Sequence, residues 1–121
     1  MPWLAVGTAA MLLGVVAGAF GAHSLAPQLD ARSLQTFETA VRYHLIHGLG
    51  LLAIGVLVAL DLDSGASLSG ALMTAGIVLF SGSLYWLALG GPSWLGPVTP
   101  LGGICLILAW GCLFVAVLRQ T

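Results

Sequence analysis

The chain has 121 residues, of which 60% are hydrophobic and only 6% are charged, and its formal net charge is -1. Soluble domains carry about 25% charged residues, so this composition predicts a membrane protein. The sequence has no lysine and three arginines, which leaves no basic surface to neutralise phosphates and excludes a nucleic-acid partner.

Four apolar stretches follow one another along the chain, and a bilayer core needs about 20 mostly apolar residues for each helical span. The expected helices cover residues 3–22, 32–60, 67–90 and 99–118. We therefore expect an all-α fold with one membrane domain, residues 1–121. It is an integral membrane bundle of four transmembrane helices, with an amphipathic extension leading into the second. Any site must lie between helices or at their ends, because the connections are too short to hold a soluble domain.

Small residues recur along these helices and predict close packing. Membrane helices associate through van der Waals contact, and glycine lets two backbones approach each other. The expected helix-packing positions are Gly7, Gly14, Gly18, Gly21, Gly82, Gly102 and Gly103. The first stretch lacks the positively charged start of a signal peptide, so we expect it to remain in the protein, with both termini on one side of the membrane.

The amphipathic extension begins after Pro27, where Asp30 or Ser33 is placed to cap a new helix. Its polar side includes Glu38 and Arg42, whose spacing and order favour a helical ion pair. The opposite face follows the rhythm of a buried helix surface. That face consists of Leu34, Phe37, Val41, His44 and Gly48.

Three histidines occur close together in the sequence. His23 follows the first span, and His44 and His47 lie near the start of the second, beside Tyr43. If the first two helices are antiparallel neighbours, His23 reaches the membrane level of the other two. Such a cluster could bind a metal or haem, relay protons or hydrogen-bond a quinone carbonyl. The alternative is a structural polar cluster held by hydrogen bonds between helices.

The later part of the third helix adds hydroxyl groups and Tyr85. Because the chain alternates between sides of the membrane, Tyr85 also approaches the histidine level. The candidate ligand or polar cluster is therefore His23, Tyr43, His44, His47 and Tyr85. The two helical histidines lack the glutamate of the Glu-x-x-His di-iron pattern, and we expect no metal and no cofactor. Thr99 is predicted to cap the last helix, with Pro100 in its first turn.

Four motifs carry a resemblance to a known family. They are Gly18 to His23, Tyr43 to His47, Leu79 to Tyr85, and Thr99 to Gly103 with Trp110. In order and spacing the chain resembles domain-of-unknown-function family 423, which includes YgdD-like bacterial inner-membrane proteins and eukaryotic transmembrane protein 256. The resemblance implies a four-helix integral membrane protein whose biochemical role is not established.

The resemblance also bears on individual positions. It implies that His23, Tyr43, His47, Tyr85 and the turn at 99–103 are motif positions, and that His44 stands where glutamine is also familiar. Family members often have a basic C-terminal tail, which implies termini in the cytoplasm. The arginine count of the loops leans the other way, with two arginines in the first connection against Arg119 at the end. We follow the resemblance.

The sequence thus predicts a small protein of the bacterial inner (plasma) membrane, in contact with the lipid bilayer. We expect a structural or accessory subunit that packs with itself, as a homo-oligomer, or with a larger membrane complex. The alternative is a binding or transport module for a small ligand, metal or quinone, built on the histidine cluster. We expect no enzyme, because no nucleophile, base and orienting group fall together and no carboxylate lies inside a span.

Overall fold

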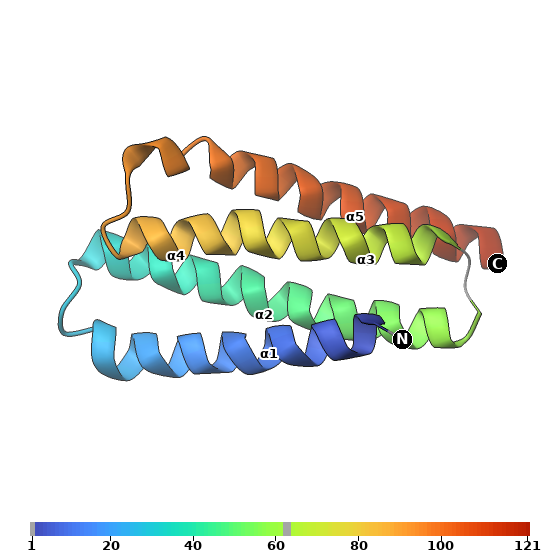
Figure 1. The fold of residues 1–121 in the computed structure, drawn as a ribbon, viewed down its shortest axis with the longest axis horizontal. Coiled ribbons are helices and arrows are strands. Elements are labelled where there is room, and N and C mark those ends of the chain that lie inside the picture. Colours follow the sequence, from blue (N-terminus) through green and yellow to red (C-terminus); the bar gives the residue numbers. More distant parts are fainter. Residues whose placement is uncertain (1, 62–63) are drawn as a thin grey trace.

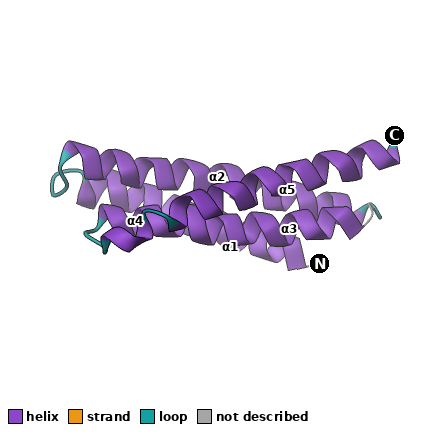
Figure 2. Cartoon of the chain, turned by 90° about the horizontal axis from the view of Figure 1, so that it is seen from above, coloured by secondary structure: helices purple, strands orange, loops and turns teal. Residues whose placement is uncertain are grey.

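The computed structural model describes residues 2–61 and 64–121, and within them every regular element is helical. Figures 1 and 2 show an elongated bundle of antiparallel helices whose connections lie at its two ends. The elements in chain order are α1 (Pro2–Phe20), the π-helical η1 (Gly21–Leu25), α2 (Ala31–Ala59), α3 (Ser64–Gly76), the π-helical η2 (Ile77–Ser81), α4 (Gly82–Ala88), the 3-10 helix η3 (Ser93–Leu95) and α5 (Val98–Gln120).

Within the described residues, four continuous helical segments are long and apolar enough to cross a membrane, which confirms the expected fold class. They are Pro2–Leu25, Ala31–Ala59, Gly65–Ala88 and Ser93–Gln120. The element ends differ from the expected ranges by one to three residues, close to the usual uncertainty of helix ends. The sequence pattern gave no sign of the two π-helical segments, which interrupt otherwise α-helical spans.

The amphipathic extension of α2 begins at Asp30, whose side chain accepts a hydrogen bond from the Ser33 backbone N–H at 2.7 Å. Asp30, and not Ser33, is therefore the cap. Glu38 and Arg42 both lie on the exposed side of the helix. Among the described residues no carboxylate lies within 4 Å of the Arg42 guanidinium, so Glu38 and Arg42 do not form the helical ion pair that their spacing allows.

Helix α2 is the centre of the packing. It contacts α1 along most of its length and α3, η2 and α4 on another side, whereas α5 packs mainly against α3 and η2. The main apolar core lies where α2, α3 and α5 meet, and it includes Leu51, Ile54, Met73 and Leu106. Much of the remaining surface of α1 and α5 is apolar and exposed, as expected of helices that face lipid.

The glycine stripe of α1 lies against α2. A Cβ atom built at Gly7 would lie 2.9 Å from the backbone nitrogen of Leu52, and one at Gly14 would lie 2.7 Å from a methyl carbon of Leu45. Gly21 and Gly18 face α2 in the same way, Gly21 at the ring of Phe37. A larger residue at Gly7 would meet the α2 backbone, whereas at Gly14, Gly18 and Gly21 it would require an α2 side chain to move.

The glycines of the second half differ from one another. A Cβ at Gly102 would collide with the backbone of Leu79 and Phe80, so Gly102 sets the approach of α5 to η2. At Gly103 a Cβ would make an ordinary contact, 3.8 Å from the Phe80 ring. Gly82 does not meet the expectation of a packing glycine: no atom lies within 4 Å of a Cβ built there, because this side of α4 borders a cavity.

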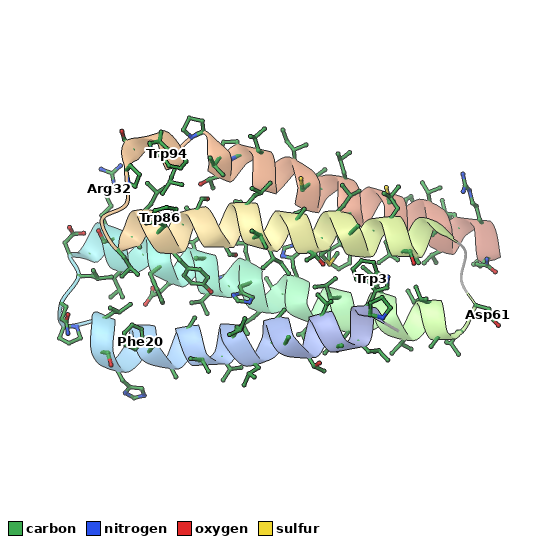
Figure 3. The ribbon with its side chains drawn as sticks, in the orientation of Figure 1. Trp3, Phe20, Arg32, Asp61, Trp86 and Trp94 are labelled. Carbon is green, nitrogen blue, oxygen red and sulfur yellow. The ribbon has the colours of Figure 1, made fainter. Side chains whose placement is uncertain are left out.

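Aromatic residues mark both ends of the bundle. Trp86 and Trp94 lie near one end with their ring centroids 6.1 Å apart, and Trp3 lies near the other, where its indole N–H donates to the hydroxyl of Ser67 at 3.3 Å (Figure 3). Tryptophan is enriched at membrane–water interfaces. Both termini lie at the Trp3 end, as an even number of spans requires (Figure 1).

Candidate functional site

His44 and Tyr85 form the most buried side-chain pair among the candidate residues. The Nδ1 atom of His44 lies 2.8 Å from the Tyr85 hydroxyl oxygen. The pair joins α2 to α4, and Phe37 packs against the Tyr85 ring with centroids 5.1 Å apart. The imidazole tautomer decides which group donates the hydrogen. Sequence reasoning placed Tyr85 at the level of the histidines, and the structure brings it into direct contact with one of them.

The His44 ring also touches α1. It faces the backbone of Ala10, and its Cδ2 atom would lie 3.4 Å from a Cβ built at Gly14. The imidazole therefore lies where α1, α2 and α4 meet, with 7% of its surface exposed. A polar ring at such a junction is stabilised when it finds hydrogen-bond partners, and here Tyr85 is the partner of Nδ1.

His47 faces different neighbours. Its Nδ1 atom lies 2.6 Å from the Tyr43 carbonyl oxygen one turn earlier in α2, so the N–H at this position donates to its own helix. The ring stacks on Tyr43 with centroids 5.9 Å apart and lies equally far from the Trp110 ring of α5. Tyr43 in turn packs on Phe80 of η2. This second cluster is aromatic, and it is directed toward α5 rather than α1.

His23 lies apart from both clusters. It is exposed on η1 and makes no hydrogen bond or ring contact in the structure. The expectation that it reaches the level of His44 is wrong for a geometric reason: Gly14 is the α1 residue at that level. His23 follows Gly14 by nine positions along the helix, which corresponds to about 13 Å along the axis.

Two buried serines tie helices together through backbone carbonyls. The Ser81 hydroxyl donates to the Ala40 carbonyl at 2.8 Å, and the Ser69 hydroxyl donates to the Ala109 carbonyl at 2.6 Å. Ser83 shares a 2.6 Å hydrogen bond with Thr99 of α5. Thr99 therefore lies inside α5 and contacts another helix, and it is not the expected cap. The cap position of α5 is occupied by Pro97, which makes no side-chain hydrogen bond there.

The arrangement offers no metal site in the described part of the chain, where no three His, Cys, Asp or Glu residues are grouped to hold an ion. The side-chain nitrogen and oxygen atoms that are buried in this part all have hydrogen-bond partners. The polar groups inside the bundle thus stabilise contacts between helices. Sequence reasoning missed their partners Phe37, Phe80 and Trp110, because apolar residues carry no sequence signal of which polar group they will cover.

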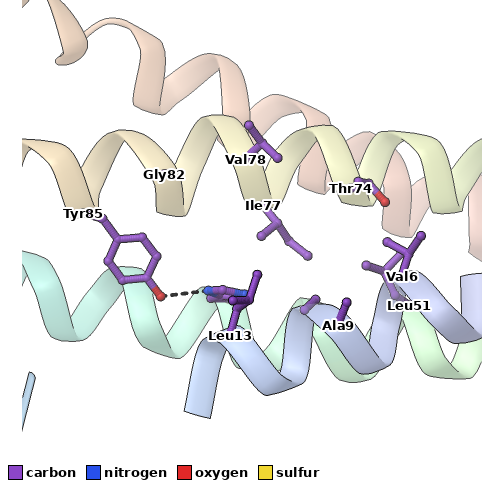
Figure 4. A pocket seen from close by; sticks show the side chains of 11 residues that line it. Val6, Ala9, Leu13, Leu51, Thr74, Ile77, Val78, Gly82 and Tyr85 are labelled. Carbon is purple, nitrogen blue, oxygen red and sulfur yellow. Dashed lines mark hydrogen bonds between the residues drawn. The ribbon is translucent and has the colours of Figure 1, made fainter. Parts of the chain in front are cut away.

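One cavity adjoins the polar pair. It has a volume of about 460 Å³ and lies between α1, α2 and the α3–η2–α4 segment. Tyr85 lies at one end of it (Figure 4), hydrogen-bonded to His44, which also lines the cavity. Its walls are apolar and include Ala9, Leu13 and Ile77. Small-molecule sites in proteins have volumes of about 300 to 1,000 Å³, so this cavity is large enough for a ligand.

Sequence comparisons agree with this architecture. A family described as "Protein of unknown function (DUF423)" matches residues 17–103. The chain belongs to this family. It is 43% identical over 120 residues to the UPF0382 membrane protein YwdK of Bacillus subtilis, covering 97% of this chain and 96% of that protein. A UPF0382 membrane protein of Staphylococcus epidermidis is 40% identical over 117 residues, covering 97% and 95%.

Family membership confirms the resemblance read from the four motifs. No solved structure matches this chain. The relatives are named as membrane proteins and come from bacteria, and together with the four spans this places the chain in a bacterial inner (plasma) membrane. It is a small integral membrane protein whose biochemical role is not established.

Proposed function

We propose that this protein is a small structural or accessory subunit, which packs with a second copy or with a larger membrane complex, and not an enzyme. The observation that carries the proposal is the complete internal use of the buried polar groups in the described residues. Catalytic groups are commonly left poised for a substrate, whereas here the histidine and serine side chains stabilise helix contacts.

The outer surface supports the same role. On α5 the side chains of Ile107 and Phe114 are 72% and 64% exposed, and on α1 Leu12 is 66% exposed. These faces offer wide apolar contact areas at the edges of the bundle. Close helix packing in membranes relies on van der Waals contact, and α5 carries an exposed small residue, Gly111, with open space around it.

The chemistry available to an enzyme is sparse. Glu38 is the carboxylate nearest to the histidines in sequence, and it lies on the exposed side of α2, away from the buried face that carries His44. Cys105 and Cys112 are half-buried on α5, and neither belongs to a group of three or more His, Cys, Asp or Glu side chains among the described residues. A nucleophile held by a base and an orienting group is the usual arrangement of a catalytic site.

Photo-cross-linking in living cells tests the proposal. The photoreactive residue benzoylphenylalanine is introduced at Ile107 on α5 and, in a second strain, at Leu12 on α1. We expect a cross-linked protein product from at least one position, of the mass of a dimer or of a larger complex. Cross-links to lipid alone at both positions would contradict a subunit role, because both exposed edges would then face only the bilayer.

A further inference from the structure

The cavity beside His44 and Tyr85 is enclosed on several sides yet open toward the membrane. Leu13 and Val78, which lie on its rim, are 61% and 64% exposed. The α1 wall and the α3–α4 wall meet only weakly, since α1 packs almost entirely on α2. The exposed rim residues lie on α1 and η2, so a molecule dissolved in the bilayer would enter sideways between these two elements.

The lining restricts what could enter. No carboxylate or guanidinium is among the lining residues, and apart from Thr74 the polar groups are the imidazole and the phenol at one end. The Thr74 hydroxyl already donates to the Gly70 carbonyl at 2.8 Å, so it offers little to a ligand. An ion would lose its hydration here without gaining a partner of opposite charge, so the occupant must be uncharged.

The polar end can act as a hydrogen-bond donor or acceptor. A phenol hydroxyl both donates and accepts, and the neutral imidazole exchanges donor and acceptor nitrogens between its tautomers. A quinone carbonyl needs a donor and the hydroxyl of its reduced form needs an acceptor. When the His44 Nδ1–H donates to the Tyr85 oxygen, the Tyr85 O–H is free to donate to a quinone carbonyl. When the Tyr85 O–H donates to Nδ1 instead, the Tyr85 oxygen can accept from the hydroxyl of the reduced ring. The ester carbonyl of a phospholipid would use only the first arrangement.

Small residues on two walls of the cavity leave room for a ring. Ala9 and Ala10 on α1 and Gly82 on α4 are small residues on its walls, and a Cβ at Gly82 would meet no atom within 4 Å. From Tyr85 to Thr74 the cavity follows the helix axis for about 16 Å. The π-helical η2 lies between these two residues, and such segments often occur at functional sites.

We propose that this cavity binds the head group and first isoprenoid units of a membrane quinone, with a ring carbonyl at the Tyr85 hydroxyl and the hydrocarbon tail directed toward Thr74. The binding is independent of the accessory role argued above. It requires no electron transfer by the protein itself, and residues of α1, α2 and α4 would all contact the ring.

The test uses the full chain in detergent micelles, titrated with menaquinone-4 and followed by native mass spectrometry. We expect one quinone per chain. Gly82→Leu fills the cavity and should weaken binding at least tenfold, and Tyr85→Phe should weaken it about three- to tenfold through loss of one hydrogen bond. Gly111→Leu is the matched control, since it also adds a side chain to an open helical glycine but lies away from the cavity, on α5. It should bind like the unchanged protein.

Leu13→Trp provides a second obstructing variant, because Leu13 is exposed on the rim and its replacement does not disturb the core. Weaker quinone binding in both obstructing variants, with normal binding in Gly111→Leu, supports the site. Absence of a quinone adduct in the unchanged protein would overturn it. Equal binding in Gly82→Leu and Leu13→Trp would do so as well, and so would a phospholipid adduct that replaces the quinone and is lost in these variants.

Discussion

The Nδ1 atom of His44 and the hydroxyl oxygen of Tyr85 lie 2.8 Å apart, although 41 positions separate the two residues in the sequence. This contact joins α2 to α4 next to a cavity of about 460 Å³ that both side chains line. A buried hydrogen-bonding atom that loses its partner costs more than the bond itself contributes. Loss of either side chain would therefore leave the other without its hydrogen-bond partner, and mutation of either residue tests whether this contact stabilises the fold.

Tyr85→Phe should lower the free energy of unfolding by about 1–3 kcal/mol, because the ring still packs on Phe37 while His44 loses its partner. Unfolding by sodium dodecyl sulfate in mixed micelles, followed by circular dichroism, measures this. Tyr43→Phe is the control, since the Tyr43 hydroxyl makes no hydrogen bond in the structure and its side chain is 38% exposed. Equal losses in the two variants would contradict a structural role for the pair.

Gly102→Ala and Gly103→Ala form a pair that tests the packing of α5 on η2. At Gly102 the added methyl group meets the backbone of Leu79 and Phe80, which cannot move aside as a side chain can. Overpacking of this kind costs about 1–3 kcal/mol or more. The same change at Gly103 meets only open space and the Phe80 ring, and we expect little loss. Similar stability of both variants in the micelle assay would show that α5 lies elsewhere.

Ser81→Ala removes a hydroxyl that is 1% exposed and donates to the Ala40 carbonyl of α2. Hydrogen bonds between membrane helices contribute about 0.6 kcal/mol on average, and up to about 1.7 kcal/mol. We expect a loss in this range in the same unfolding assay. Thr8→Ala removes an exposed hydroxyl that bonds only to its own helix, and should change stability less. A larger loss for Thr8→Ala would count against the interhelical bond.

Acidification should weaken the start of α2 through Asp30. The hydrogen bond from the Ser33 backbone N–H holds the pKa of the Asp30 carboxyl below its usual value. A carboxyl with a lowered folded-state pKa stabilises the fold above its unfolded pKa of about 3.9, and this contribution is lost as the pH falls through the folded-state value. Hydrogen exchange at residues 33–36 should therefore rise at low pH. Asp30→Asn keeps an uncharged cap, so hydrogen exchange in this variant, corrected for its intrinsic pH dependence, should not rise in this way. A rise equal to that of the unchanged protein would assign the effect to another group.

The fold could be predicted from the sequence because spans of this length and hydrophobicity permit few arrangements. The packing role of the α1 glycines and the buried face of α2 could also be predicted, since both depend on spacing along one helix. The site was only partly readable. The alternating direction of the helices placed Tyr85 at the level of the histidines. The sequence could not exclude His23 from the cluster, because the register between α1 and α2 depends on which glycine meets which side chain. Gly82 could not be told from Gly102, since a helical glycine gives no sign of whether a backbone or a cavity lies opposite.

Native mass spectrometry of the protein, extracted gently from its own membranes in polymer nanodiscs, tests the proposed subunit role most directly. We predict a species heavier than one chain, a homo-oligomer or a complex with another subunit. It should persist in His47→Ala and in His47→Phe, because His47 packs inside the bundle against Tyr43 and Trp110. A bare monomer in the unchanged protein, or loss of the assembly in both folded His47 variants, would contradict a subunit role in which the histidines only stabilise the bundle.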